Sequence, residues 1–222
     1  MTRYFKFLAI AVTSLVFTGC AIKQADVDYS AFRQHQPKSI LVLPPLNNTS
    51  DLRATYSVMA STTLPLAEAG YYVFPVALVD QTFKENGLVN PGEMHQASPR
   101  KLNEIFGADA VLYITVTNYG ATSALAGSNI VVSAEAALID TRTSTKLWEG
   151  KASASDAEGK QNQNQTGLVG LLIQGIINQV ANSVSDPGYR IGRITNQRLL
   201  STETRGLLPG PRSPKFEQAQ GQ

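Results

Sequence analysis

The sequence of 222 residues contains a single cysteine, Cys20, so the chain can form no internal disulfide. It has two histidines, His35 and His95, and no Cys/His pair at the spacing of a zinc site. It also lacks the serine elbow of α/β hydrolases, the phosphate-binding P-loop and the dinucleotide-binding glycine motif. The carboxylates are scattered, and no two are placed for acid–base work. These absences predict a protein that is not an enzyme and that needs no metal and no cofactor.

The sequence also has no large excess of basic or acidic residues. The chain has 19 Lys and Arg residues against 17 Asp and Glu residues, and Arg3 and Lys6 are the only charges among residues 1–19. Without those two, 17 basic and 17 acidic side chains remain. A balanced surface offers no footprint for nucleic acid and no polybasic patch for anionic lipid.

The N-terminus has the organisation of a secretory signal. Arg3 and Lys6 precede an apolar run over residues 7–18, which is too short to span a bilayer as a stable anchor. The run ends at Gly19-Cys20. This pattern predicts a signal peptide over residues 1–19, cleaved between Gly19 and Cys20, and resembles the bacterial lipobox, with Phe17 where Leu is usual. The resemblance implies that the Cys20 thiol carries diacylglycerol.

The residue after the cysteine bears on the destination of the anchor. It is Ala21, whereas Asp at this position retains enteric lipoproteins at the inner membrane. The resemblance therefore implies an outer-membrane anchor with the domain facing the periplasm, although exposure at the cell surface is an alternative. Stable membrane anchoring requires more than one acyl chain, and the two acyl chains of the diacylglycerol together with an N-acyl chain meet this requirement.

Hydrophobic patterning predicts alternating strands and helices, followed by a meander. The expected strands cover residues 39–43, 71–75, 109–119, 129–140 and 146–155. The expected helices cover residues 52–69, 76–86 and 99–106, and the last has Ser98 at its N-cap and Gly107 at its end. Loops are expected at residues 88–97 and 120–128, Asp140 is expected to shape a turn, and Trp148 is expected in the core. This order predicts an α/β fold with a single mixed sheet covered by helices. The early strands would be parallel, and a C-terminal hairpin would be antiparallel.

Three further segments set the expected domain boundaries. Residues 20–38 are polar and predict a lipidated tether, residues 39–205 predict the α/β periplasmic domain, and residues 206–222 predict a flexible tail rich in Pro and Gly. Residues 167–184 are the most hydrophobic stretch after the signal, with Gln174, Asn178 and Asn182 on one helical stripe. They predict an amphipathic helix on the sheet. A subunit interface and, less favoured, a membrane span are the alternatives.

The segment LPPLNNTSDLRATYSVMASTTLPLAEAGYYVFPV, residues 43–76, resembles a family of bacterial lipoproteins of unknown function typified by a meningococcal surface antigen. The order of strands, with GADA at 107–110 and DTRT at 140–143, more distantly resembles the curli-secretion lipoproteins and the amino-terminal domain of the Tol–Pal periplasmic protein. The resemblance covers roughly residues 39–185. It implies a homodimeric periplasmic domain that serves a transport or envelope-assembly complex.

Three hypotheses on function follow. The first is a non-enzymatic component of an envelope complex, held by its lipid and binding other envelope proteins. The second is an enzyme or small-molecule binder with a site near residues 46–51, where Asn47, Asn48, Thr49 and Ser50 precede a helix N-terminus that could hold an anion. Helix capping explains the same four residues. The third is a subunit of a secretion pore, which is disfavoured because the expected loop at 120–128 is too short for the long hairpins of the curli family.

Overall fold

One mixed sheet organises the computed structural model, which describes residues 27–124, 127–161, 186–204 and 206–220. The strands lie in the order β3-β1-β4-β5-β6, and β2 also pairs with β4. The strands are β1 (Ser39–Val42), β2 (Leu46–Asn47), β3 (Tyr72–Val73), β4 (Ala110–Ala124), β5 (Gly127–Asp140) and β6 (Lys146–Ser155). The helices are α2 (Ser30–His35), α3 (Ala54–Glu68), α4 (Val76–Glu85), α5 (Pro91–Met94), α6 (Pro99–Phe106), α7 (Asp156–Gln161), α9 (Pro187–Leu200) and α10 (Phe216–Gln220).

The predicted mixture of parallel and antiparallel pairing is confirmed. Strand β1 runs parallel to both β3 and β4, and β4, β5 and β6 form an antiparallel meander. Every side chain from Ile40 to Leu43 is fully buried. This follows from the position of β1, because a parallel strand covered on both faces must be apolar along its whole length.

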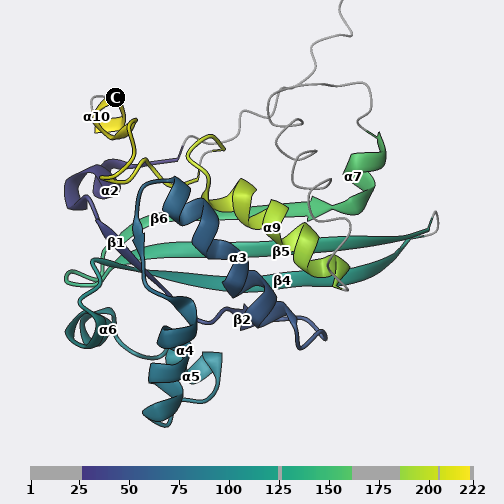
Figure 1. The fold of residues 1–222 in the computed structure, drawn as a ribbon, viewed down its shortest axis with the longest axis horizontal. Helices are drawn as coiled ribbons and strands as arrows, with labels where there is room; N and C mark the ends of the chain where they lie inside the picture. Colours follow the sequence, from purple (N-terminus) through teal and green to yellow (C-terminus); the bar gives the residue numbers. More distant parts are fainter. Residues whose placement is uncertain (1–26, 125–126, 162–185, 205, 221–222) are drawn as a thin grey trace, which may run out of the picture.

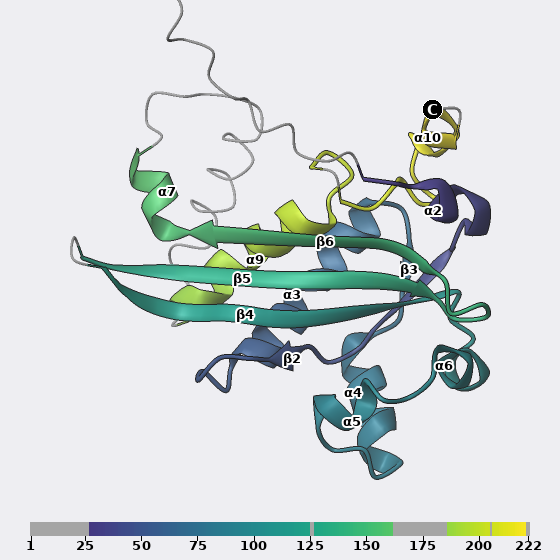
Figure 2. The same cartoon turned by 180° about the vertical axis from the view of Figure 1, so that it is seen from behind.

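Helices cover the two faces of the sheet unequally. Helices α3 and α9 lie side by side across one face, as Figure 1 shows, and close the larger core cluster over β4, β5 and β6. Helices α4, α5 and α6 gather on the other face at one end only, over β1 and the start of β4 (Figure 2). The rest of that second face, along β4, β5 and β6, carries no helix in the part of the chain that the structure describes.

Local signals explain where several helices begin and end. The Ser98 hydroxyl accepts from the Lys101 amide at the start of α6, Pro99 occupies its first turn, and Gly107 ends it with a φ of 70°. Helix α9 begins in the same manner at Asp186, whose carboxylate accepts from the Gly188 amide. Helix α3 continues past the buried Pro65 to Glu68, one residue short of the expected end at residue 69.

The expected turn and core residues lie as predicted. Asp140 is fully buried, and its Oδ1 accepts from the amides of Arg142 and Thr143 in the turn before β6. Trp148 is 3% exposed and belongs to the larger core cluster. The expected loop at 88–97 contains the short helix α5, whose start is capped by the side chain of Asn90.

The expected hairpin loop at residues 120–128 is wrong. Strand β4 continues to Ala124, and β5 begins at Gly127, so that only residues 125 and 126 separate them. Small polar residues favour a loop in isolation. Here Ala121 pairs with Ile130 and Thr122 with Asn129 across the two strands, and this ladder overrides the local preference.

Both segments that flank the expected domain pack against it. Phe32 of α2 is 3% exposed, and its ring lies against that of Tyr71. Leu207 is 1% exposed, and the Gly210 amide donates to the carbonyl of Ala69. The described parts of the expected tether and tail, residues 27–38 and 206–220, therefore belong to the folded domain, because they supply apolar side chains to its core.

Two expectations fall outside the described residues. They are the signal and lipidation site at Gly19 and Cys20, and the amphipathic helix over residues 167–184. Among the helices that the structure describes, none combines the length and the apolarity that a membrane crossing requires.

Candidate functional site

The loop proposed from the sequence lies where expected, between β1 and α3. Leu46 and Asn47 form β2, which pairs in parallel with Thr115 and Val116 of β4. The Asn48 amide donates to the Val116 carbonyl at 2.9 Å. This pairing with the central strand was not expected from the sequence, and it fixes the loop on the sheet.

Side chains of this loop bond mainly to the loop itself. The Asn47 Oδ1 accepts from both the amide and the hydroxyl of Thr49, at 2.9 and 2.7 Å, and its Nδ2 donates to the Asp51 carbonyl. The Thr49 hydroxyl also accepts from the Asp51 amide. These bonds fold a turn and leave Asn47 and Thr49 little capacity for a ligand. These residues do not cap α3 directly, because the helix begins at Ala54, with Arg53 at its N-cap position. The Arg53 amide donates to the carboxylate of Asp51.

A polar cluster joins this loop to α9 and β4. Arg53 contacts Asp51 at 2.6 Å and Asp186 at 3.5 Å. The Tyr119 hydroxyl donates to Asp186 Oδ2 at 2.9 Å and lies 2.6 Å from the Ser57 hydroxyl. The cluster therefore ties the start of α3, the start of α9 and the middle of β4 together.

The contacts within this cluster shift the pKa values of three of its side chains. The hydrogen bond from Arg53 lowers the pKa of Asp51, and the same contact raises the pKa of Arg53. Burial raises the pKa of the Tyr119 hydroxyl. Asp51 is therefore held ionised beside Arg53, and Tyr119 keeps its proton near neutral pH, so that both groups are in the states that their contacts within the cluster require.

The two histidines lie on different elements. His95 is half-buried, with Nε2 2.9 Å from the Pro44 carbonyl and its ring edge-on to Tyr113 at 5.2 Å. Burial lowers the pKa of His95. His35 lies on α2, where Nδ1 is 2.8 Å from the Ala31 carbonyl. Within the described ranges no three His, Cys, Asp or Glu residues are grouped so that they could hold a metal ion.

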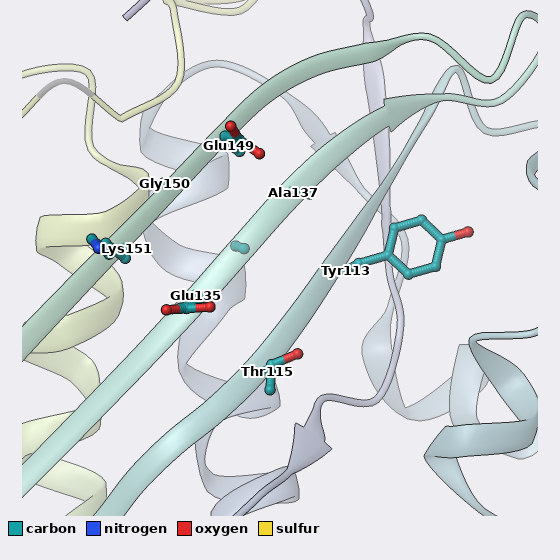
Figure 3. Close-up of a pocket in the computed structure, with 8 residues that line it drawn as sticks. Tyr113, Thr115, Glu135, Ala137, Glu149, Gly150 and Lys151 are labelled. Atoms are coloured by element: carbon teal, nitrogen blue, oxygen red, sulfur yellow. The ribbon is translucent and has the colours of Figure 1, made fainter. Parts of the chain in front are cut away.

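The uncovered face of the meander carries a shallow hollow of about 550 Å³. Figure 3 shows side chains from three strands around it: Tyr113 and Thr115 from β4, Glu135 from β5, and Glu149 and Lys151 from β6. They form two cross-strand rows, because the register pairs Tyr113–Ala137–Glu149 and Thr115–Glu135–Lys151. Ala137 stands in the middle of the first row, and its short side chain leaves the space between its neighbours.

Sequence reasoning missed this face as a site. The alternation in β4 did place Tyr113, Thr115 and Thr117 on one side of a strand. The residues that complete the hollow come from β5 and β6, and only the strand register brings them beside β4. Glu135 and Lys151 lie directly opposite one another, a pairing of opposite charges that favours this register.

One mixed sheet with helices packed on it defines the domain as an α/β domain. The family model described as "Putative lipoprotein GNA1162-like" matches residues 27–212. The chain belongs to this family of GNA1162-like lipoproteins. The matched range includes the described N-terminal segment, residues 27–38, and the first part of the C-terminal segment, up to residue 212.

Individual relatives agree with this assignment. The chain is 48% identical over 200 residues to "Putative lipoprotein NMB1124/NMB1162" of Neisseria meningitidis serogroup B, covering 89% of this chain and 92% of the relative. The crystal structure of lipoprotein GNA1162 from Neisseria meningitidis is also similar, with a TM-score of 0.53 and 48% identity, covering 66% of this chain and 100% of that one. The PelC dodecamer of Paraburkholderia phytofirmans is 12% identical with a TM-score of 0.42 over 78% of this chain and 90% of that one, a likeness that supports no functional argument.

Proposed function

We propose that the protein is an outer-membrane lipoprotein, anchored through Cys20, whose domain is a non-enzymatic, homo-oligomeric component of an envelope transport or secretion complex. The family supports the lipoprotein class. The anchor itself rests on the single cysteine at the end of the apolar leader and on Ala21 behind it. The domain would face the periplasm and act by binding envelope proteins.

The observation that carries the binding role is the uncovered face of β4, β5 and β6. In an antiparallel meander one face can remain solvated, so openness alone is not a site. This face has in addition a hollow at Ala137, flanked by an aromatic ring, a hydroxyl and both signs of charge from Glu135 and Lys151. A projecting side chain of a partner protein would fit above Ala137 and find hydrogen-bonding groups on either side.

The catalytic alternative near residues 46–51 receives no comparable support. Asn47 and Thr49 use their polar groups inside their own turn. Arg53, the nearest cation, is already bonded to Asp51 and Asp186. An anion at this loop would have to displace those contacts.

Two variants test the binding role in the native host. Ala137→Arg fills the hollow on a solvent-facing position, and Ser153→Arg places the same side chain on the same face of β6, outside the lining residues. After crosslinking in cells, we expect the natural chain and Ser153→Arg to yield the same discrete complex with another envelope protein, and Ala137→Arg to lose it. If both variants lose the crosslinked complex, or if neither loses it, the hollow is not the binding site.

The anchor is tested separately. Cys20→Ala should abolish labelling by radioactive palmitate and move the protein from the outer-membrane fraction to the periplasmic fraction. Ala21→Asp should leave the labelling intact and shift the protein to the inner-membrane fraction. A Cys20→Ala chain that still fractionates with the outer membrane would refute the lipid anchor.

A further inference from the structure

Strand β6 forms a long open edge of the sheet. It is the last strand in the order β3-β1-β4-β5-β6, and Figure 2 shows it outermost beside β5. It spans ten residues, whereas β3 at the opposite edge spans two. A long edge strand presents unpaired backbone amides and carbonyls, which can pair with another chain.

Two contacts show which backbone groups of β6 point away from β5. The carbonyl of Ser153 accepts from the Arg198 guanidinium at 2.7 Å. The amide of Ser155 donates to the Glu158 carboxylate at 3.0 Å. Both side chains approach β6 from outside the sheet, so these backbone groups are not bonded to β5.

The same orientation recurs at every second residue. Antiparallel neighbours alternate between residue pairs that exchange hydrogen bonds and pairs that do not. No register shift interrupts β6 between Glu149 and Ser155. The amides and carbonyls of Glu149 and Lys151, and the amide of Ser153, therefore also point away from β5. Among the described residues, no group is bonded to them.

Side chains close the far end of β6 and leave residues 149–153 open. Arg198 and Glu158, which hold the far end, also pair with each other at 2.6 Å. Residues 149–153 contain neither a proline nor a bulge, two features that protect the edges of natural sheets. Glu149 and Lys151 line the hollow on the open face (Figure 3), so their side chains do not cover the backbone edge.

A second cavity lies at the start of this open stretch. It has a volume of about 380 Å³ and lies between β6 and residues 27, 28 and 31 of the N-terminal segment. Ala31, Leu147 and Trp148 make part of its lining apolar. An apolar side chain of an added strand would fit against this part.

The chemistry of the open stretch identifies its occupant as an extended polypeptide. Outward donors and acceptors recur along it about every 7 Å, the spacing of alternate residues in a strand. Glu149 already contacts Lys146 at 2.7 Å, whereas Lys151 makes no ion pair among the described residues. An acidic residue opposite Lys151 would supply the missing partner. A side chain three positions further along the added strand would point to the other face, toward the cavity at Trp148.

We propose that β6 accepts an extended segment of an envelope protein as an additional strand, with an acidic residue opposite Lys151 and an apolar residue in the cavity at Trp148. In strand addition, main-chain hydrogen bonds give affinity, and pockets for alternate side chains give specificity. The added strand would widen the open face beside the hollow at Ala137. The inference rests on the binding role in the proposed function and names the mode of that binding.

Proline substitution separates the backbone of β6 from its side chains. Lys151→Pro removes an outward amide that the sheet does not use, and edge strands tolerate proline at such positions. Lys151→Ala removes the side chain and keeps the amide. In the native host, the crosslinked complex should fall roughly tenfold or more for Lys151→Pro and less than about threefold for Lys151→Ala. A complex that survives Lys151→Pro, or that Lys151→Ala reduces as strongly, overturns strand addition.

Hydrogen exchange examines the same groups without a substitution. In the purified full-length chain, the amides of Lys151 and Ser153 should exchange roughly tenfold or more faster than those of Gly150 and Ala152, which face β5. In the complex purified through a tag on this chain, the two fast amides should become slow. Amides that stay fast in the complex would overturn the inference. Slow exchange in the free chain would do the same, because the edge would then be covered by the chain itself or by a second copy.

The cavity is tested by two leucines on α2. Ala31→Leu fills the cavity, whereas Gln34→Leu places the same side chain at an exposed position outside its lining. The crosslinked complex should fall roughly fivefold or more for Ala31→Leu and stay unchanged for Gln34→Leu. Equal effects of the two variants would contradict an apolar side chain of the partner in this cavity.

The outcomes separate this inference from the proposed function. If Ala137→Arg loses the complex while Lys151→Pro keeps it, the hollow binds the partner without strand addition, and the proposed function stands. If Ala137→Arg and Lys151→Pro both keep the complex, the binding role of this face fails together with the inference.

Discussion

The amide of Gly210 donates to the carbonyl of Ala69 at 2.7 Å, which fixes the C-terminal segment against the end of α3. Gly70, the next residue, has a φ of 95°, and a Cβ there would lie 2.4 Å from the amide nitrogen of Ser213. Residues 206–220 therefore close the domain at this corner, and the space available at Gly70 depends on their position.

Gly70→Ala should destabilise the fold by about 3 kcal/mol, from the left-handed backbone and the clash with Ser213 together. Gly87→Ala is the control, because its φ is 82° and a Cβ there would meet nothing within 4 Å. It should cost only about 1–2 kcal/mol. Urea denaturation followed by the fluorescence of Trp148, the single tryptophan, measures both. Equal losses would mean that the C-terminal segment does not pack on Gly70 in solution.

The Gly70 contact also indicates what the sequence could predict. Strand β6 and helix α6 were predicted with their observed limits, because β-rich alternation and the Ser98-Pro99 and Gly107 signals act locally. The packing of Gly210 on Ala69 joins residues 141 positions apart. No local pattern encodes such a contact, and a segment rich in Pro and Gly resembles a mobile tail.

The candidate sites also differ in whether a local sequence pattern or only the fold identifies them. The loop at Asn47 was found from the sequence because its turn chemistry is local, and the structure assigns its side chains to that turn. The hollow at Ala137 needs the register of three strands.

Asn196 of α9 joins the two helices of the covered face. It is fully buried, and its amide nitrogen donates to the Val58 carbonyl at 2.9 Å and to the Ser61 hydroxyl at 2.7 Å. Asn196→Ala removes both bonds and leaves a gap between α3 and α9, so we expect a loss of about 2–4 kcal/mol in the free energy of unfolding. Gln197→Ala, at the next and only half-buried position, should cost less than about 1 kcal/mol. A loss of similar size in both variants would contradict the role of the buried amide.

The carboxylate of Asp186 caps the N-terminus of α9 and accepts a hydrogen bond from the Tyr119 hydroxyl. Asp186→Ala should lower the stability by about 1–2 kcal/mol, the usual value of an N-cap. Asp186→Asn keeps a capping oxygen but loses the attraction to the exposed Arg53 and the second oxygen that accepts from Tyr119, so it should cost less than Asp186→Ala, about 0.5–1 kcal/mol. Thermal unfolding at two salt concentrations distinguishes the contributions. A large, salt-sensitive loss for Asp186→Asn would show that the ion pair outweighs the cap.

His95 should make the domain less stable in mild acid. Burial against Tyr113 lowers its pKa in the folded state, so the unfolded chain binds more protons between the folded value and the unfolded value of about 6.5. The contribution of the neutral ring is fully present above the unfolded value and is lost as the pH falls through it toward the folded pKa. The free energy of unfolding, measured by urea denaturation from pH 8 to pH 5, should therefore decline more steeply for the natural chain than for His95→Gln. His35→Gln keeps the ring at position 95 and should follow the natural chain. Parallel profiles for the natural chain and His95→Gln would mean that protonation of His95 is not coupled to folding.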